Sequence, residues 1–149
     1  MCRISMIILL LIFQIPLVFA SNGKEDVFVR KNKFGVEIGG SSLIMSTKYE
    51  RILLNYNRHK TAVELGVGLL SLNTGINQLI SFHQHHVELK MGALGTRMIY
   101  SDSIYYSFGV GYRFQKSHGR TAFQISCPIN YGKNSGYFVN VGVSISRVF

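Results

Sequence analysis

The sequence is poor in cysteine, and the few it has exclude an internal disulfide. Only Cys2 and Cys127 occur in the chain. Cys2 lies in a segment that we expect to be cleaved, so Cys127 would be left without a partner. Its place on an apolar register indicates a small packed side chain rather than a reactive thiol. No cysteine stands directly after the expected cleavage point, which argues against an acyl-anchored lipoprotein.

Acidic residues are also scarce, with seven Asp and Glu against sixteen Lys and Arg. A basic balance is typical of nucleic-acid binding, but these basic residues are dispersed and no cluster is interleaved with stacking aromatics. We therefore expect no nucleic-acid partner. The densest basic group is Arg30, Lys31 and Lys33. We interpret it as a solvated lead-in segment, with contact to anionic lipid headgroups as the alternative.

Residues 1–20 have the pattern of a cleaved secretory signal peptide. Arg3 supplies a positive charge, the apolar run 4–19 follows, and Ala20-Ser21 offers small residues for cleavage. The run contains a proline and is shorter than the ~20 apolar residues that a membrane helix needs. An uncleaved anchor is the alternative. We expect export, and then a flexible N-terminal segment over 21–32 and one domain over 33–149.

Beyond this front segment, every apolar run is broken by a polar residue or glycine within a few positions. A mature chain embedded in a membrane would therefore have to be a closed sheet. The residues alternate with the period of two that is typical of β-strands, in eight segments of which the fourth is the weakest. The segments are 33–40, 47–55, 61–71, 78–82, 86–99, 104–115, 120–130 and 137–149. Turn residues separate many of them, including Asn73-Thr74-Gly75.

The two alternate faces of these segments differ in character. In 61–71, for example, Val63, Leu65 and Val67 alternate with Glu64 and Gly66. A soluble, lipocalin-like ligand-binding barrel would point the apolar face inward, whereas a membrane barrel would point it outward. Glycine suits a narrow lumen, and the polar face is thinly charged for a surface in water, so we favour the membrane orientation.

The predicted fold is therefore all-β, an eight-stranded antiparallel up-and-down transmembrane β-barrel. Its lumen would be filled by a structural network of ion pairs and hydrogen bonds. The residues predicted to form this network are Glu37, Lys48, Glu50, Glu64, Glu88, Lys90 and Arg113.

The last strand carries a further signal, because it ends on an aromatic residue, Phe149. Together with the stretches 34–53, 85–96 and 110–131, it resembles a family of small, mostly uncharacterised bacterial outer-membrane β-barrel proteins. That resemblance implies an outer-membrane location, outer-membrane lipids as partners, and a final phenylalanine that the barrel-insertion machinery reads. Arg147 departs from it, since the family more often has an aromatic or apolar residue at that place. The resemblance carries over no catalytic residue.

Two sets of residues have chemistry that could form a site. His83, His85 and His86 form one local cluster. In an extended chain only the first two would share a face, so we expect a polar turn and no metal site. Rim serines among Ser41, Ser42 and Ser46 could pair with a histidine, but no specific spacing supports this. We therefore predict no catalytic set and no cofactor.

The predicted function is that of a structural or surface-interaction barrel. The alternatives are a membrane-embedded lipid-modifying enzyme and the soluble ligand-binding barrel. With both termini on the periplasmic side, the loops 41–46, 72–77, 100–103 and 131–136 would face outward. Tyrosines near strand ends could form an interfacial girdle. These are Tyr49, Tyr56, Tyr100, Tyr105, Tyr112, Tyr131 and Tyr137.

Overall fold

The computed structural model describes residues 31–40, 44–56, 58–69, 71–98, 101–116, 119–133 and 135–149. The expected signal peptide and nearly all of the expected flexible segment 21–32 lie outside these ranges. Within them the chain forms nine β-strands. They are β1 (Asn32–Gly39), β2 (Met45–Tyr56), β3 (His59–Gly68), β4 (Ser71–Phe82), β5 (His85–Met98), β6 (Ser101–Gln115), β7 (Thr121–Gly132), β8 (Gly136–Val139) and β9 (Gly142–Val148).

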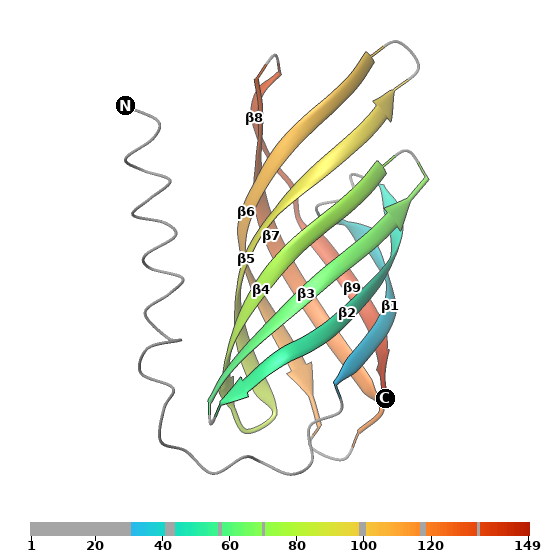
Figure 1. Cartoon of the computed structure of the whole chain (residues 1–149). Helices are drawn as coiled ribbons and strands as arrows, with labels where there is room; N and C mark the ends of the chain where they lie inside the picture. The colour runs from blue at the N-terminus through green and yellow to red at the C-terminus, as the bar shows by residue number, and fades with distance from the viewer. Residues whose placement is uncertain are drawn as a thin grey trace, which may run out of the picture.

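The strands close into one antiparallel barrel (Figure 1). Each strand from β1 to β7 pairs with the next along the chain, and β9 joins β7 to β1. The closing contact continues to the last residue, since the backbone N–H of Phe149 donates to the carbonyl of Asn32 at 2.9 Å and that of Asn32 donates back at 3.0 Å. Closure pairs β1–β7 and β9 on both sides, and among the described strands β8 alone is paired on one side, with β7. The predicted eight-stranded antiparallel barrel is thus confirmed, with one extra strand.

The extra strand arises because the expected terminal strand 137–149 is interrupted at Asn140 and Val141. β8 and β9 pair with β7 in one continuous register, so together they fill the eighth position. Asn140 lies opposite Pro128, and its N–H donates to the Pro128 carbonyl at 3.1 Å. A proline has no N–H to return that bond. The ladder is therefore interrupted at this one pair.

The expected fourth strand, 78–82, was too short, and the expected turn Asn73-Thr74-Gly75 is wrong. Both are parts of β4, which pairs with β3 and β5 along nearly its whole length. The loop expected over 72–77 is therefore strand. Asn73 and Asn77 point into the barrel, where polar side chains are needed. Polar residues that usually mark a turn here belong to the inward face of a strand.

A bulge explains why the alternation in the second strand is unclear. The register between β2 and β3 shifts between Ile52 and Leu54. One extra residue, Leu53, reverses the inward and outward positions that follow it. Both Leu53 and Leu54 are exposed as a result. The sequence pattern in this strand is thus broken by geometry and not by a weak preference for strand.

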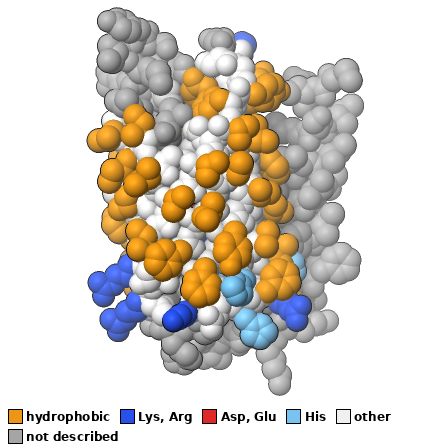
Figure 2. All heavy atoms as spheres, turned by 180° about the vertical axis from the view of Figure 1, so that it is seen from behind, with side chains coloured by type: hydrophobic (Ala, Val, Ile, Leu, Met, Phe, Trp, Pro, Cys, Tyr) orange, Lys and Arg blue, Asp and Glu red, His pale blue; other side chains and the backbone are white. Residues whose placement is uncertain are grey.

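The apolar register faces outward and the polar register inward. In β7 every even-numbered residue from Ala122 to Gly132 is buried and every odd-numbered one is exposed. Hydrophobic side chains spread over the face shown in Figure 2, while Lys, Arg and His side chains gather near its lower end. Cys127, expected to be packed, is exposed on this outer surface. The interior is mostly polar, with a few buried apolar residues such as Leu79 and Leu94.

The two ends of the barrel differ in the strands that are joined there. The links β1–β2, β3–β4, β5–β6 and β7–β8 lie at one end, and the C-terminus lies at the other (Figure 1). No helix in the described part of the chain is long and apolar enough to cross a membrane.

Candidate functional site

The chemistry of this molecule is concentrated inside the barrel. Eight charged side chains from β1, β2, β3, β5 and β6 lie on the inward register, because residues two apart along a strand share a face. Four are carboxylates and four are cations. Seven of them are less than a tenth exposed, and Lys90 is slightly more so.

These eight groups form one unbroken series of ion pairs in which the sign alternates. Its order is Glu37, Lys48, Glu64, Lys90, Glu88, Arg113, Glu50 and Lys33. The Arg113 guanidinium contacts both Glu50, at 2.7 Å, and Glu88. The other nitrogen-to-oxygen distances run from 2.6 Å for Lys48–Glu37 to 3.6 Å for Lys90–Glu88. The series links strands from β1 to β6 across the lumen.

Neutral polar side chains fill in around the charges. The Asn77 amide of β4 donates to Glu50 at 3.0 Å and to Glu64 at 2.9 Å, so it holds two carboxylates near each other. Lys33 donates to Gln124 at 2.8 Å, which brings β7 into the network. A buried charge is costly unless it is both paired and hydrogen-bonded. The charges balance in number and the amides add hydrogen bonds to Lys33, Glu50 and Glu64. Both oxygens of Glu88 are held by ion pairs alone.

Glycines on the inward register make room for the long side chains. A Cβ on Gly66 would lie 2.1 Å from the side-chain oxygen of Asn73. At Gly40 a Cβ would lie 2.7 Å from the Glu37 carboxylate, and the positive φ of 66° there independently favours glycine. The small residues therefore allow the lumen to be filled, as expected for an eight-stranded barrel.

The cavity beside the ion-pair series is small. A cavity of about 30 Å³ lies beside Glu64, Asn73 and Lys90. That volume holds roughly two water molecules. It is too small for an organic substrate, and Met91, Ala93 and Pro128 line it together with the polar residues.

The structure places all seven residues of the predicted lumen network in this series. Sequence reasoning missed Lys33, which was interpreted as solvated lead-in. It is only 5% exposed and its Nζ lies 2.9 Å from Glu50. Its odd position in β1, shared with Gly35 and Glu37, was the signal that could have identified it. Asn77 was missed because the sequence appeared to turn just before it.

The other candidate residues do not come together. His86 points inward, with its Nδ1 2.8 Å from the Ser81 hydroxyl, whereas His85 points outward to the Tyr112 hydroxyl. His83 occupies a left-handed turn position with φ of 58°. No group of three metal-ligating side chains occurs in the ranges that the structure describes. Of the rim serines, Ser46 is buried and Ser41 and Ser42 lie outside the described residues.

Of the seven tyrosines expected in a girdle, Tyr49, Tyr112, Tyr131 and Tyr137 are exposed on the outer surface. Tyr105 instead points toward the lumen and donates to the Ser135 hydroxyl at 3.0 Å. Its ring lies edge-on to Phe138 at a centroid distance of 5.3 Å. Tyr56 is half-buried, and Tyr100 lies outside the described residues.

The fold and its interior define a small, closed, antiparallel β-barrel with a charge-balanced polar core. Comparison of the chain with protein-family models, with curated proteins and with solved structures found no match.

Proposed function

We propose that this chain is a bacterial outer-membrane β-barrel that crosses the bilayer with its strands and acts as a structural or surface-interaction protein. The observation that carries the proposal is the outward apolar surface, to which all nine strands contribute exposed hydrophobic side chains. Soluble monomers rarely expose contiguous apolar patches larger than a few hundred Å². A surface of this extent is suited to lipid.

The height of the apolar surface fits a bilayer. On β7 the outward residues from Phe123 to Tyr131 include Ile125 and Ile129, and all are exposed. The nine residues 123–131 are separated by eight steps of ~3.4 Å, which span about 27 Å along the strand. At a tilt of ~40° this corresponds to about 21 Å along the barrel axis, close to the ~25 Å band of membrane barrels.

An aromatic row marks one border of this surface. Tyr106, Tyr131 and Tyr137 lie side by side on β6, β7 and β8. The Tyr131 and Tyr137 rings are 4.7 Å apart, and all three side chains are exposed. Aromatic residues collect at the interfaces of membrane barrels. This row supports a girdle at the end of the barrel opposite the C-terminus.

The interior supports a barrel that does not conduct. The ion-pair series spans the lumen, and the cavity beside it holds only roughly two waters. In this proposal the partners are outer-membrane lipids and, during assembly, the barrel-insertion machinery. Phe149, with its side chain 57% exposed at the end of the closing ladder, is the proposed insertion signal.

The test is to express the whole chain in a Gram-negative host, fractionate the cells, and compare boiled with unboiled samples on a gel. The expected result is a protein of the outer membrane that dissolves only with detergent and changes its migration on boiling. A resident soluble periplasmic protein is the control. Recovery of the folded chain in buffer without detergent, with no change on boiling, would contradict the proposal.

A further inference from the structure

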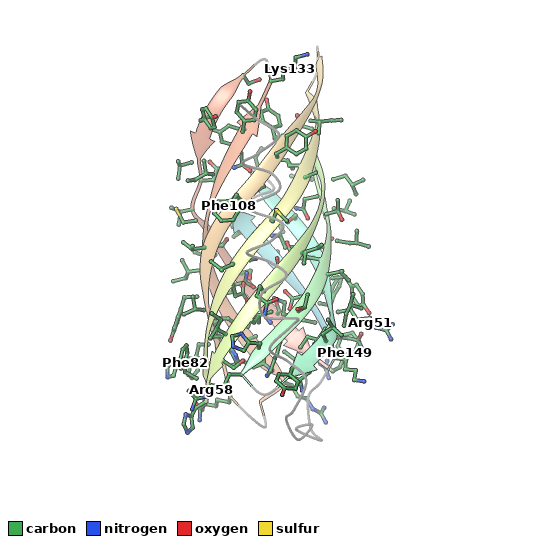
Figure 3. All side chains as sticks on the ribbon, turned by 60° about the vertical axis from the view of Figure 1, so that its left-hand side comes forward. Arg51, Arg58, Phe82, Phe108, Lys133 and Phe149 are labelled. Carbon is green, nitrogen blue, oxygen red and sulfur yellow. The ribbon has the colours of Figure 1, made fainter. Side chains whose placement is uncertain are left out.

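The exposed charged side chains whose burial the structure describes are all cationic, and most of them lie at one end of the barrel. All four described glutamates lie in the interior. Six exposed cations lie near the end that carries the C-terminus, where Figure 3 labels two of them with Phe149, and Lys133 lies at the other end. The six are Lys31, Arg51, Arg58, Lys116, Arg120 and Arg147.

Two of these cations flank a groove on the outer surface. The groove has a volume of about 500 Å³ and runs over β1, β9 and the start of β7. Phe34, Val36 and Ile145 supply its apolar lining, and Arg120 and Arg147 lie beside them. Apolar and cationic chemistry thus meet in one depression.

The two arginines lie on neighbouring stretches of chain beside this groove. Arg147 pairs with Thr121 of β7 on one side and with Phe34 of β1 on the other. Arg120 directly precedes Thr121, and its carbonyl accepts from the N–H of Val148 at 2.7 Å. Both arginine side chains are exposed. No ion pair joins either arginine to a described glutamate, because all four of these glutamates lie inside the barrel.

We propose that this groove binds one anionic glycerophospholipid, with its phosphate between Arg120 and Arg147 and an acyl chain along Phe34, Val36 and Ile145. The proposal rests on the membrane-spanning function above, since it needs the groove to face lipid. Guanidinium groups bind phosphate oxygens through paired hydrogen bonds. Clusters of cations beside a membrane surface attract anionic lipids.

The occupant follows from the position of the groove. The cations lie at the C-terminal end, which in the proposed orientation faces the periplasm and its phospholipid leaflet. A phospholipid with a net negative headgroup, such as phosphatidylglycerol, matches both the charge and the apolar groove. Lipopolysaccharide phosphates would be on the opposite side.

The experiment uses native mass spectrometry of the whole mature barrel in detergent, titrated separately with phosphatidylglycerol, phosphatidylethanolamine and lipid A. The wild-type protein is expected to retain one phosphatidylglycerol at least tenfold more tightly than either of the others. The double variant Arg120→Gln/Arg147→Gln is expected to lose that preference. The matched control Arg51→Gln/Arg58→Gln removes two arginines of the same rim outside the groove and should keep it.

Equal retention of the three lipids by the wild type, a preference for lipid A, or an undiminished preference in the groove variant would each overturn this inference. The change of migration on boiling is measured on every sample. If it is present while the lipid preference is absent, the membrane barrel stands and only the lipid site fails. If the groove variant does not fold, the wild-type titration decides alone.

Discussion

At the residue scale, the period of two predicts the interior well. Seven inward charges could be named because each occupies the same register as glycine and small polar residues. Lys33 could not, because a neighbouring run of basic residues made it appear part of a solvated segment. What sequence cannot supply is the pairing order. Contacts such as Arg113–Glu50 depend on how β6 and β2, which are not paired with each other, face each other across the lumen.

Arg113 is the residue on which the interior series most depends, because it contacts Glu50 and Glu88 together. Replacing it with Met would leave two buried carboxylates short of a cation. We expect Arg113→Met to lower the free energy of unfolding by about 3–5 kcal/mol. Urea unfolding in detergent micelles, followed by circular dichroism, measures this.

The control is Arg58→Met at the exposed rim, where we expect a change within about 0.5 kcal/mol. Arg113→Lys keeps the charge but loses the fork that reaches both carboxylates, so it should fall between the two. Equal stability of Arg113→Met and the control would show that the interior series does not stabilise the barrel.

At the element scale, strand existence was predictable but strand limits were not. β4 was underestimated because Asn73 and Gly75, which usually mark turns, are what an inward face beside other strands requires. The bulge at Leu53 and the break at Asn140 were also hidden, since both are properties of a pair of strands and not of one segment. Asparagine and glycine are common both in turns and on the inward face of a strand, so the sequence alone does not separate the two.

The break between β8 and β9 has a specific cause that can be tested, the missing N–H of Pro128. Because the Pro128 carbonyl accepts from Asn140, an amide at position 128 would point to the same neighbouring strand. Pro128→Ala should therefore create an amide that is protected from hydrogen exchange and should join the two strands. Exchange measured by NMR in micelles follows that amide and the amides of residues 139–142.

Ser126→Ala is the matched control, since it changes another inward side chain of β7 and leaves the backbone donor intact. It should not alter protection around Asn140. Free exchange of the new amide at position 128, as in an open loop, would show that Pro128 does not cause the break.

At the scale of the whole molecule, alternation predicts a barrel but cannot give the direction of its faces. The structure gives the direction, because the charged side chains pair inside the barrel while most large hydrophobic side chains are exposed. Polar side chains pair inside this barrel and hydrophobic side chains lie outside. This distribution is the reverse of that in a water-soluble protein. The central claim is that lipid covers this outer surface.

Two single arginine substitutions, at different heights along the outer face of β6, test whether lipid covers this surface. Val110 lies midway along the outward row of β6, and Ile104 lies six residues nearer the end of the barrel; both are exposed. In lipid vesicles we expect Val110→Arg to lower the free energy of unfolding by about 2–4 kcal/mol and Ile104→Arg by about 0–1 kcal/mol. Equal small effects, with the Val110→Arg protein folded in buffer alone, would show instead that water covers this surface.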